Sequence, residues 1–285
     1  MSVQGIITAM VTPFDRHGRV AEEETVALMR YLVAHGSDGL VVAGTTGEAS
    51  TLTDEEKCRL WELAVGECAD VPVIASTGSN DTRHTVDLTE RATALGVDAV
   101  LIVTPYYNKP NRRGIVAHFR AAAAATDKPV IVYNIPARCV VDIPNDLLRD
   151  LAEIPNICAV KQARADGLEA IDGLDLLAGN DDMLAAVLDA GGSGGILVAS
   201  HIAAPQMRRM IDEPHARAEI NESLAGLFAA LSITTNPIPI KAALELLGHH
   251  VGGLRLPLVE ASDDELARIR EAVELYRPLI AGGTR

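Results

Sequence analysis

Short apolar runs alternate with longer segments of mixed polarity through most of the chain. The runs are rich in valine and isoleucine and are almost continuously apolar. Strands that are buried on both faces of a parallel sheet have this pattern. The predicted strands are residues 6–11, 39–43, 71–75, 99–103, 129–133, 157–161, 175–178 and 195–199.

The segments between these runs carry apolar residues at helical spacing and have polar or glycine residues at their ends. Thr53, with Glu56 three residues later, predicts a capping box, and Gly96 is placed to end a helix. The predicted helices are residues 22–35, 54–67, 82–95, 112–126, 146–152, 168–172, 182–190 and 205–212.

A strand followed by a helix, eight times over, predicts an α/β fold, a TIM (β/α)8 barrel, for residues 1–215. A doubly wound sheet is the alternative, but no GxGxxG lies between the first strand and the first helix. Residues 217–232, 239–247 and 264–279 predict a C-terminal three-helix extension, residues 216–285, that packs on the barrel as part of a single functional unit. The last few residues are expected to be frayed.

Charge and composition narrow the possible partners. The 285 residues include 25 Lys and Arg against 39 Asp and Glu, a net charge of −14, which argues against nucleic acid or an anionic membrane. No apolar run reaches about 18 residues and the N-terminus has no basic region, so we expect a cytoplasmic protein. Four cysteines without a CxxC pair indicate reduced thiols, and the lack of HExxH or HxH argues against a metal site.

Chemistry in a barrel of this kind lies where the strands end and their following loops begin. Lys161 ends an apolar strand, where burial disfavours the ammonium form and lowers the pKa. A neutral amine is what Schiff-base chemistry with a carbonyl substrate requires. The alternative is a lysine that only extends from a strand end into water. Tyr133, which ends the preceding strand, favours the catalytic interpretation.

Other polar groups follow the same strand ends. Thr45 and Thr46 lie in a glycine-flanked turn, where they either satisfy the turn backbone or hold a small carboxylate. Arg138 is either a surface charge or a clamp for a second carboxylate. Tyr106 and Tyr107 are candidates for a subunit contact.

Four features are interpreted as structural. The glycine-dense residues 191–195 lead into a strand and are interpreted as a tight turn. Asp181 and Asp182 are expected to begin a helix. Cys139 is expected near the pocket but has no histidine partner, and His249 with His250 is expected to face solvent.

Several ordered motifs together resemble the dihydrodipicolinate synthase / N-acetylneuraminate lyase family of pyruvate-dependent enzymes. The resemblance runs from Gly5 to the segment 255–257. It is carried by residues 9–14 (AMVTPF), 44–48 (GTTGE), 77–80 (TGSN), 103–107 (VTPYY), 133–138 (YNIPAR), 160–161 (VK) and 236–241 (NPIPIK). The double threonine, Arg138 and Tyr107 are similar to the synthase branch.

The resemblance implies a reaction and a set of site residues. Pyruvate and L-aspartate 4-semialdehyde would condense to 4-hydroxy-tetrahydrodipicolinate, in lysine and diaminopimelate biosynthesis, with no cofactor besides the Schiff base. The implied catalytic residues are Lys161, Tyr133, Thr45 and Tyr107, the last reaching across a subunit interface of a homotetramer. Thr46, Arg138, Gly179 and Ile196 would bind substrate. The alternatives are another pyruvate-dependent aldolase or lyase, acting on N-acetylneuraminate or a 2-keto-3-deoxy sugar acid, and a catalytically silent pyruvate-binding barrel.

The resemblance also implies where lysine would bind in feedback-inhibited relatives. The corresponding positions here are Ala49, Asp54, Lys57, Asn80, His84 and Tyr106. Lys57 and His84 depart from the histidine and glutamate of those relatives. An ammonium at Lys57 would repel the amine of a lysine ligand, so we expect inhibition by L-lysine to be weak or absent.

Overall fold

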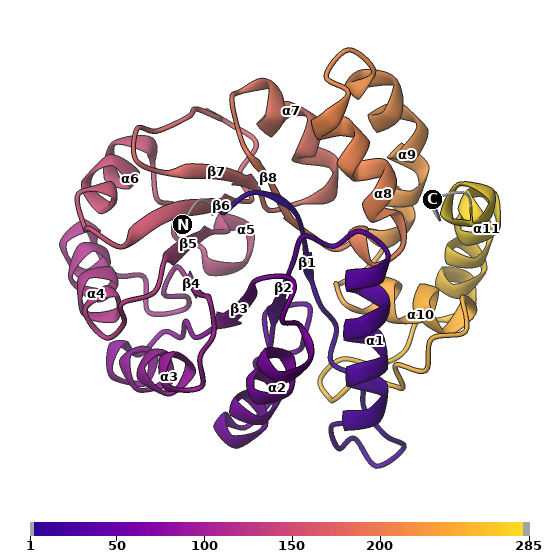
Figure 1. The fold of residues 1–285 in the computed structure, drawn as a ribbon, viewed down its shortest axis with the longest axis horizontal. Coiled ribbons are helices and arrows are strands. Elements are labelled where there is room, and N and C mark those ends of the chain that lie inside the picture. The colour runs from indigo at the N-terminus through magenta and orange to yellow at the C-terminus, as the bar shows by residue number, and fades with distance from the viewer. Residues whose placement is uncertain (1–2, 282–285) are drawn as a thin grey trace.

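Eight parallel strands close into a barrel in the computed structural model, which describes residues 3–281 (Figure 1). Each strand pairs with the next along the chain, and β8 pairs with β1. This closure confirms the predicted barrel and excludes the open doubly wound sheet. The strands are β1 Gly5–Ala9, β2 Gly39–Val42, β3 Val73–Ser76, β4 Ala99–Val103, β5 Val130–Asn134, β6 Ile157–Gln162, β7 Asp175–Ala178 and β8 Gly194–Leu197.

A ring of helices surrounds the barrel, and the last three helices lie beside α8 on one side of it (Figure 1). The capping box of Thr53 and Glu56 at the start of α2 is confirmed. The ring helices are α1 Glu22–Ala34, α2 Asp54–Glu67, α3 Thr82–Ala94, α4 Arg112–Ala124, α6 Asn145–Ala152, α7 Leu184–Asp189 and α8 Ser200–Asp212. The extension comprises α9 Arg217–Leu231, α10 Ile238–Leu246 and α11 Asp263–Ala281. The division into 1–215 and 216–285 as one functional unit stays a prediction, and the expected fraying of residues 282–285 lies outside the described residues.

The predicted helix at 168–172 is wrong. That segment has no helical residue and instead forms an isolated bridge between Ile171 and Leu174. Five residues are too few for a helix to form without strong tertiary support. Here the side chain of Glu169 instead binds Asn145 and Arg149 of α6.

The helices that follow β5, β7 and β8 differ from the prediction. α8 starts at Ser200, five residues early, with a kink at Ala203 just before Pro205, which lacks a backbone N–H. A single turn, α5 Pro136–Cys139, follows β5 and was not predicted. A 3-10 turn, η1 Asp181–Met183, precedes α7. Of the glycine-dense residues, 191–193 lead into β8 as predicted, whereas Gly194 and Gly195 are already part of that strand.

Buried side chains from all eight strands fill the barrel interior. They include Ile7, Val41, Ile74, Leu101, Ile131, Ala159, Leu177 and Ile196. Since side chains alternate along a strand, residues two positions further along also point inward. Tyr133 and Lys161 are two positions beyond Ile131 and Ala159, so the barrel directs both side chains into its carboxyl-terminal mouth.

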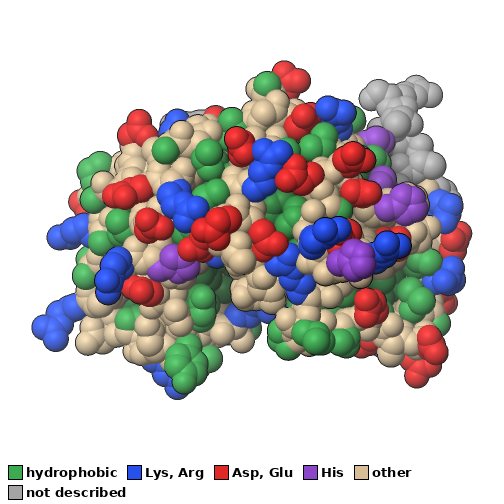
Figure 2. Space-filling view, turned by 90° about the horizontal axis from the view of Figure 1, so that it is seen from below, with side chains coloured by type: hydrophobic (Ala, Val, Ile, Leu, Met, Phe, Trp, Pro, Cys, Tyr) green, Lys and Arg blue, Asp and Glu red, His purple; other side chains and the backbone are tan. Residues whose placement is uncertain are grey.

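The distribution of charged side chains on the surface agrees with the net negative charge of the sequence (Figure 2). On the face seen in Figure 2, acidic and basic side chains are interspersed, and the described residues there show no broad patch of Lys and Arg. Among residues 3–281, no helix is long and apolar enough to cross a membrane.

Candidate active site at the barrel mouth

Two adjoining cavities open at the carboxyl ends of the strands. One has a volume of about 500 Å³ and the other about 270 Å³. Six residues line both cavities: Thr45, Thr46, Tyr133, Ile135, Arg138 and Lys161. The groups singled out from the strand ends therefore come together in space, although they come from β2, β5, β6 and the loops after them.

Lys161 is the amine at the centre of this site. Only 5% of the residue is exposed, and burial lowers the pKa of its ammonium to about 7. The charge of Arg138 lowers this pKa further, whereas that of Asp181 raises it. The lowered pKa favours the neutral amine, which is the form that can attack a carbonyl carbon.

Tyr133 lies on β5, directly in register with Lys161 on β6. The Lys161 Nζ atom is 4.2 Å from the centroid of the Tyr133 ring. Burial raises the pKa of the phenol to about 12, and a hydrogen bond with the Thr45 side chain partly offsets this rise. Tyr133 therefore keeps its hydroxyl proton at neutral pH, with its ring next to the amine.

The Thr45–Thr46 turn is held by close packing. A Cβ atom at Gly47 would lie 3.1 Å from both the Met10 carbonyl oxygen and the Thr12 hydroxyl. A larger residue at position 47 would therefore be tightly packed against the loop after β1. Thr46 is buried, and its hydroxyl oxygen accepts a hydrogen bond from Asn236 Nδ2 at 2.9 Å.

Some of the remaining predicted site residues line the two cavities and others do not. Arg138, on α5, is exposed but lines both cavities, and Gly179 lines the smaller one. Ile196 is fully buried in the barrel interior and lines neither. Tyr107 is 87% exposed and lines neither cavity of its own chain, so a relay from Tyr107 to Tyr133 is not formed within one chain. Tyr106 lines the larger cavity.

Asp181 is a site residue that the sequence interpretation missed. It was expected only to begin a helix, yet it lines the smaller cavity with Lys161. Its Oδ1 atom accepts hydrogen bonds from the backbone N–H groups of Val198 and Ala199, both at 2.9 Å. Burial raises the pKa of this carboxyl to about 6, and the charge of Lys161 acts against that rise. An acidic residue just after β7 was a usable signal, by the same strand-end rule that pointed to Lys161.

The larger cavity extends away from Lys161 to the predicted regulatory positions. It is also lined by Ala49, Asp54, Lys57, Asn80, His84 and Tyr106. The Asp54 carboxylate is 2.8 Å from His84 Nε2 and 3.4 Å from Lys57 Nζ. Its two oxygens are therefore already engaged by neighbouring side chains.

The structure also places the cysteine and the two histidines that were interpreted as structural. Cys139 is buried and lines the larger cavity, as expected. The solvent-facing interpretation holds for His250 but is wrong for His249, which is partly buried with its ring centroid 4.1 Å from that of Tyr31. No cluster of metal-ligating side chains occurs in the part of the chain that the structure describes.

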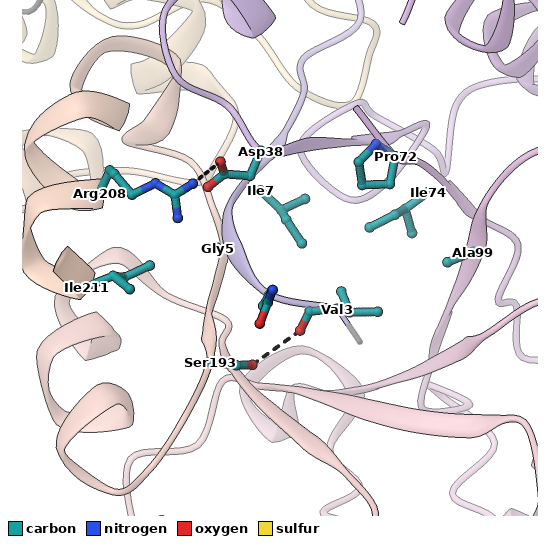
Figure 3. Close-up of a pocket in the computed structure, with 11 residues that line it drawn as sticks. Val3, Gly5, Ile7, Asp38, Pro72, Ile74, Ala99, Ser193, Arg208 and Ile211 are labelled. Atoms are coloured by element: carbon teal, nitrogen blue, oxygen red, sulfur yellow. Dashed lines mark hydrogen bonds and ion pairs between the residues drawn. The ribbon is translucent and has the colours of Figure 1, made fainter. Parts of the chain in front are cut away.

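A cavity of about 440 Å³ lies at the opposite, amino-terminal end of the barrel (Figure 3). Val3, Ile7 and Ile74 point toward it, and Arg208 pairs with Asp38 at its edge. It holds no lysine and no tyrosine. The barrel mouth is therefore the better candidate for carbonyl chemistry.

A buried lysine beside a tyrosine, in the mouth of a (β/α)8 barrel, is an arrangement suited to enzymes that form a Schiff base with a carbonyl substrate. Within that class, the chain belongs to the dihydrodipicolinate synthetase family, whose model matches residues 2–275.

Individual relatives agree with this assignment over nearly their full lengths. The 4-hydroxy-tetrahydrodipicolinate synthases of Bacillus subtilis and Moorella thermoacetica are each 44% identical, covering 93% and 94% of this chain and 96% and 97% of theirs. A dihydrodipicolinate synthase structure from Bacillus anthracis has a TM-score of 0.93 at 38% identity, covering 96% of this chain and 99% of its own. A structure from Cyanidioschyzon merolae, with lysine bound, has a TM-score of 0.93 at 39% identity, covering 95% and 97%.

Proposed function

We propose that this protein is a 4-hydroxy-tetrahydrodipicolinate synthase, a cytoplasmic lyase that condenses pyruvate with L-aspartate 4-semialdehyde. The observation that carries the chemistry is the buried Lys161 amine, with its lowered pKa, next to Tyr133. The full-length similarity to synthases of that name supports the choice of substrates.

The first half of the reaction activates pyruvate. Neutral Lys161 attacks the ketone carbon, and loss of water leaves an iminium. Thr45 and Thr46 hold the pyruvate carboxylate, together with the backbone near Gly179, which lines the same cavity. Ile196 is enclosed in the barrel interior and has no contact with the substrate in this proposal. The iminium withdraws electrons from the neighbouring methyl group, which loses a proton to give an enamine. Tyr133 moves protons during these steps.

The second half joins the two substrates. The enamine carbon attacks the aldehyde of aspartate semialdehyde, whose carboxylate Arg138 holds. The substrate amine then adds to the former ketone carbon and displaces Lys161, which closes the ring and restores the free amine. Every covalent step uses the substrate and Lys161, so the reaction as proposed needs no metal or organic cofactor.

The alternative pyruvate-dependent reactions would use Lys161 in the same way, so the acceptor substrate distinguishes them. We expect product from pyruvate with aspartate semialdehyde in a coupled assay, and no cleavage of N-acetylneuraminate or 2-keto-3-deoxygluconate under the same conditions. Faster turnover of a sugar acid would assign the protein to another branch of the family. Failure with every substrate, with pyruvate still bound, would indicate the silent barrel.

Assembly is proposed to be a homotetramer built as a dimer of dimers. Tyr106 and Tyr107 are 38% and 87% exposed, neighbouring aromatic residues in a chain with few others. Because Tyr107 lies outside the cavity of its own chain, its proposed relay to Tyr133 requires a second subunit. Light scattering at micromolar concentration should give an oligomer. A fully active monomer would remove Tyr107 from the mechanism.

L-lysine is expected to inhibit weakly or not at all. Asp54, the remaining acidic group at the regulatory positions, is already engaged by Lys57 and His84. A lysine ligand would have to displace these contacts and meet the Lys57 ammonium. Together, the displaced contacts and the repulsion should weaken the affinity for L-lysine by more than about tenfold. An inhibition curve at saturating pyruvate tests this, and half-inhibition well below about 1 mM L-lysine would contradict it.

A further inference from the structure

The motif at residues 236–241 has no part in the reaction as derived above. It comprises the last two residues before α10 and the start of that helix, far along the chain from the strand ends. Two of its side chains nevertheless contact the turn at residues 44–48. Asn236 Nδ2 donates to Thr46 Oγ1 at 2.9 Å, and Lys241 Nζ lies 2.7 Å from Glu48 Oε1.

The Lys241–Glu48 pair anchors the end of this turn. The two side chains are 2% and 1% exposed. Lys241 also donates to the Gly253 carbonyl at 2.7 Å, and Glu48 Oε2 accepts from the Arg255 backbone N–H at 3.0 Å. A buried ion pair with its remaining hydrogen bonds made holds its partners in one geometry. Docking of the extension onto the turn is thus already secured without Asn236.

Asn236 acts on a different atom, the Thr46 hydroxyl. A hydroxyl has one hydrogen to donate and two lone pairs that accept. Here one lone pair is occupied by the Asn236 amide, so the Thr46 O–H hydrogen is directed to another acceptor. Thr46 and Asn236 both line the smaller cavity, where Lys161 and Gly179 also lie. No hydrogen bond from this hydroxyl to a protein acceptor is found among the described residues, so it is available to donate to a ligand in this cavity.

We propose that Asn236 is a positioning residue that orients the Thr46 hydroxyl as a hydrogen-bond donor to the carboxylate of the 2-oxo acid. The helical extension thereby contributes to substrate recognition at the barrel mouth, through a contact that spans 190 residues of sequence. This inference rests on the proposed function, since it takes the carboxylate to be that of pyruvate.

The test measures how much pyruvate is needed for half-maximal trapping of the protein with borohydride. Asn236→Ala should raise this concentration about 5- to 30-fold, the cost of one hydrogen bond to a charged group. The kcat at saturating pyruvate and the thermal midpoint should stay close to wild type. Asn236→Asp should bind pyruvate more weakly still, because an anion then faces the carboxylate and the aspartate accepts the Thr46 hydrogen.

A double-mutant cycle separates orientation from general damage. Thr46→Val should weaken trapping about as much as Asn236→Ala, and the double variant should be little worse than Thr46→Val alone. Asn221→Ala, in α9, is the matched control and should trap pyruvate like wild type. Independent, multiplying effects of the two changes, or an unchanged pyruvate requirement in Asn236→Ala, would overturn the inference. If wild type itself is not trapped by pyruvate, the proposed function fails along with it.

Discussion

Replacing Lys161 by arginine should reduce turnover of pyruvate and aspartate semialdehyde by about 10³-fold or more, the scale seen when a covalent catalyst is removed. A guanidinium stays charged and does not form an imine with a ketone. Burial lowers the pKa of the wild-type amine to about 7, which favours the neutral form that the proposed reaction requires. Turnover should therefore be lost even when the pocket shape and positive charge are retained. Steady-state kinetics with the coupled assay measure the effect.

Two further variants test whether a loss of turnover comes from misfolding. Lys161→Met places an unbranched apolar side chain in the buried site, and it should fold at least as well and be equally inactive. Lys128→Arg makes the same chemical change outside both cavities and should keep wild-type kcat. Substantial turnover by either Lys161 variant would show that another group carries the covalent step.

Arg138→Ala should lower kcat/KM for aspartate semialdehyde by roughly 10- to 150-fold, which corresponds to about 1.5–3 kcal/mol for a charged hydrogen bond. Arg138 is exposed to solvent in the free chain, so the expected loss is smaller than that for breaking a fully buried ion pair. Trapping of pyruvate should change little, because Arg138 is assigned to the second substrate. Kinetics at saturating pyruvate, beside the borohydride experiment, give both quantities.

The matched comparisons for Arg138 are Arg138→Lys and Arg113→Ala. Lysine keeps the charge but loses the planar fork, so an intermediate loss is expected. Arg113 lies on α4, away from both mouth cavities, and its replacement should leave both steps unchanged. Equal damage to pyruvate trapping and to aspartate semialdehyde use would make Arg138 a structural residue.

The barrel could be predicted because its signals are local. Val- and Ile-rich runs of strand length alternate with capped helical segments, and eight repeats leave few architectures. Lys161 and Tyr133 followed from the same pattern, since each ends an apolar run and alternation within a strand directs both inward. The helix predicted at 168–172 does not form. A local pattern could not show that Glu169 is bound by side chains of α6.

Other features of the site depend on contacts that no local pattern contains. The position of Asp181 after β7 could have indicated a site residue, but its hydrogen bonds with the backbone after β8 depend on the fold. Asn236 was noticed as part of a motif, but its hydrogen bond to Thr46 joins residues 190 positions apart. The position of Tyr107 outside its own cavity likewise emerges only from the folded loop.

Peptide mapping after incubation with pyruvate and borohydride tests the central claim most directly. Reduction fixes the imine as a stable secondary amine, so its position on the chain can be located by mass spectrometry. We predict one reduced pyruvate adduct per chain, on the peptide that contains Lys161, and none on peptides that contain Lys57, Lys109, Lys128 or Lys241. An adduct on any of these other lysines, or no adduct at saturating pyruvate, would contradict the account.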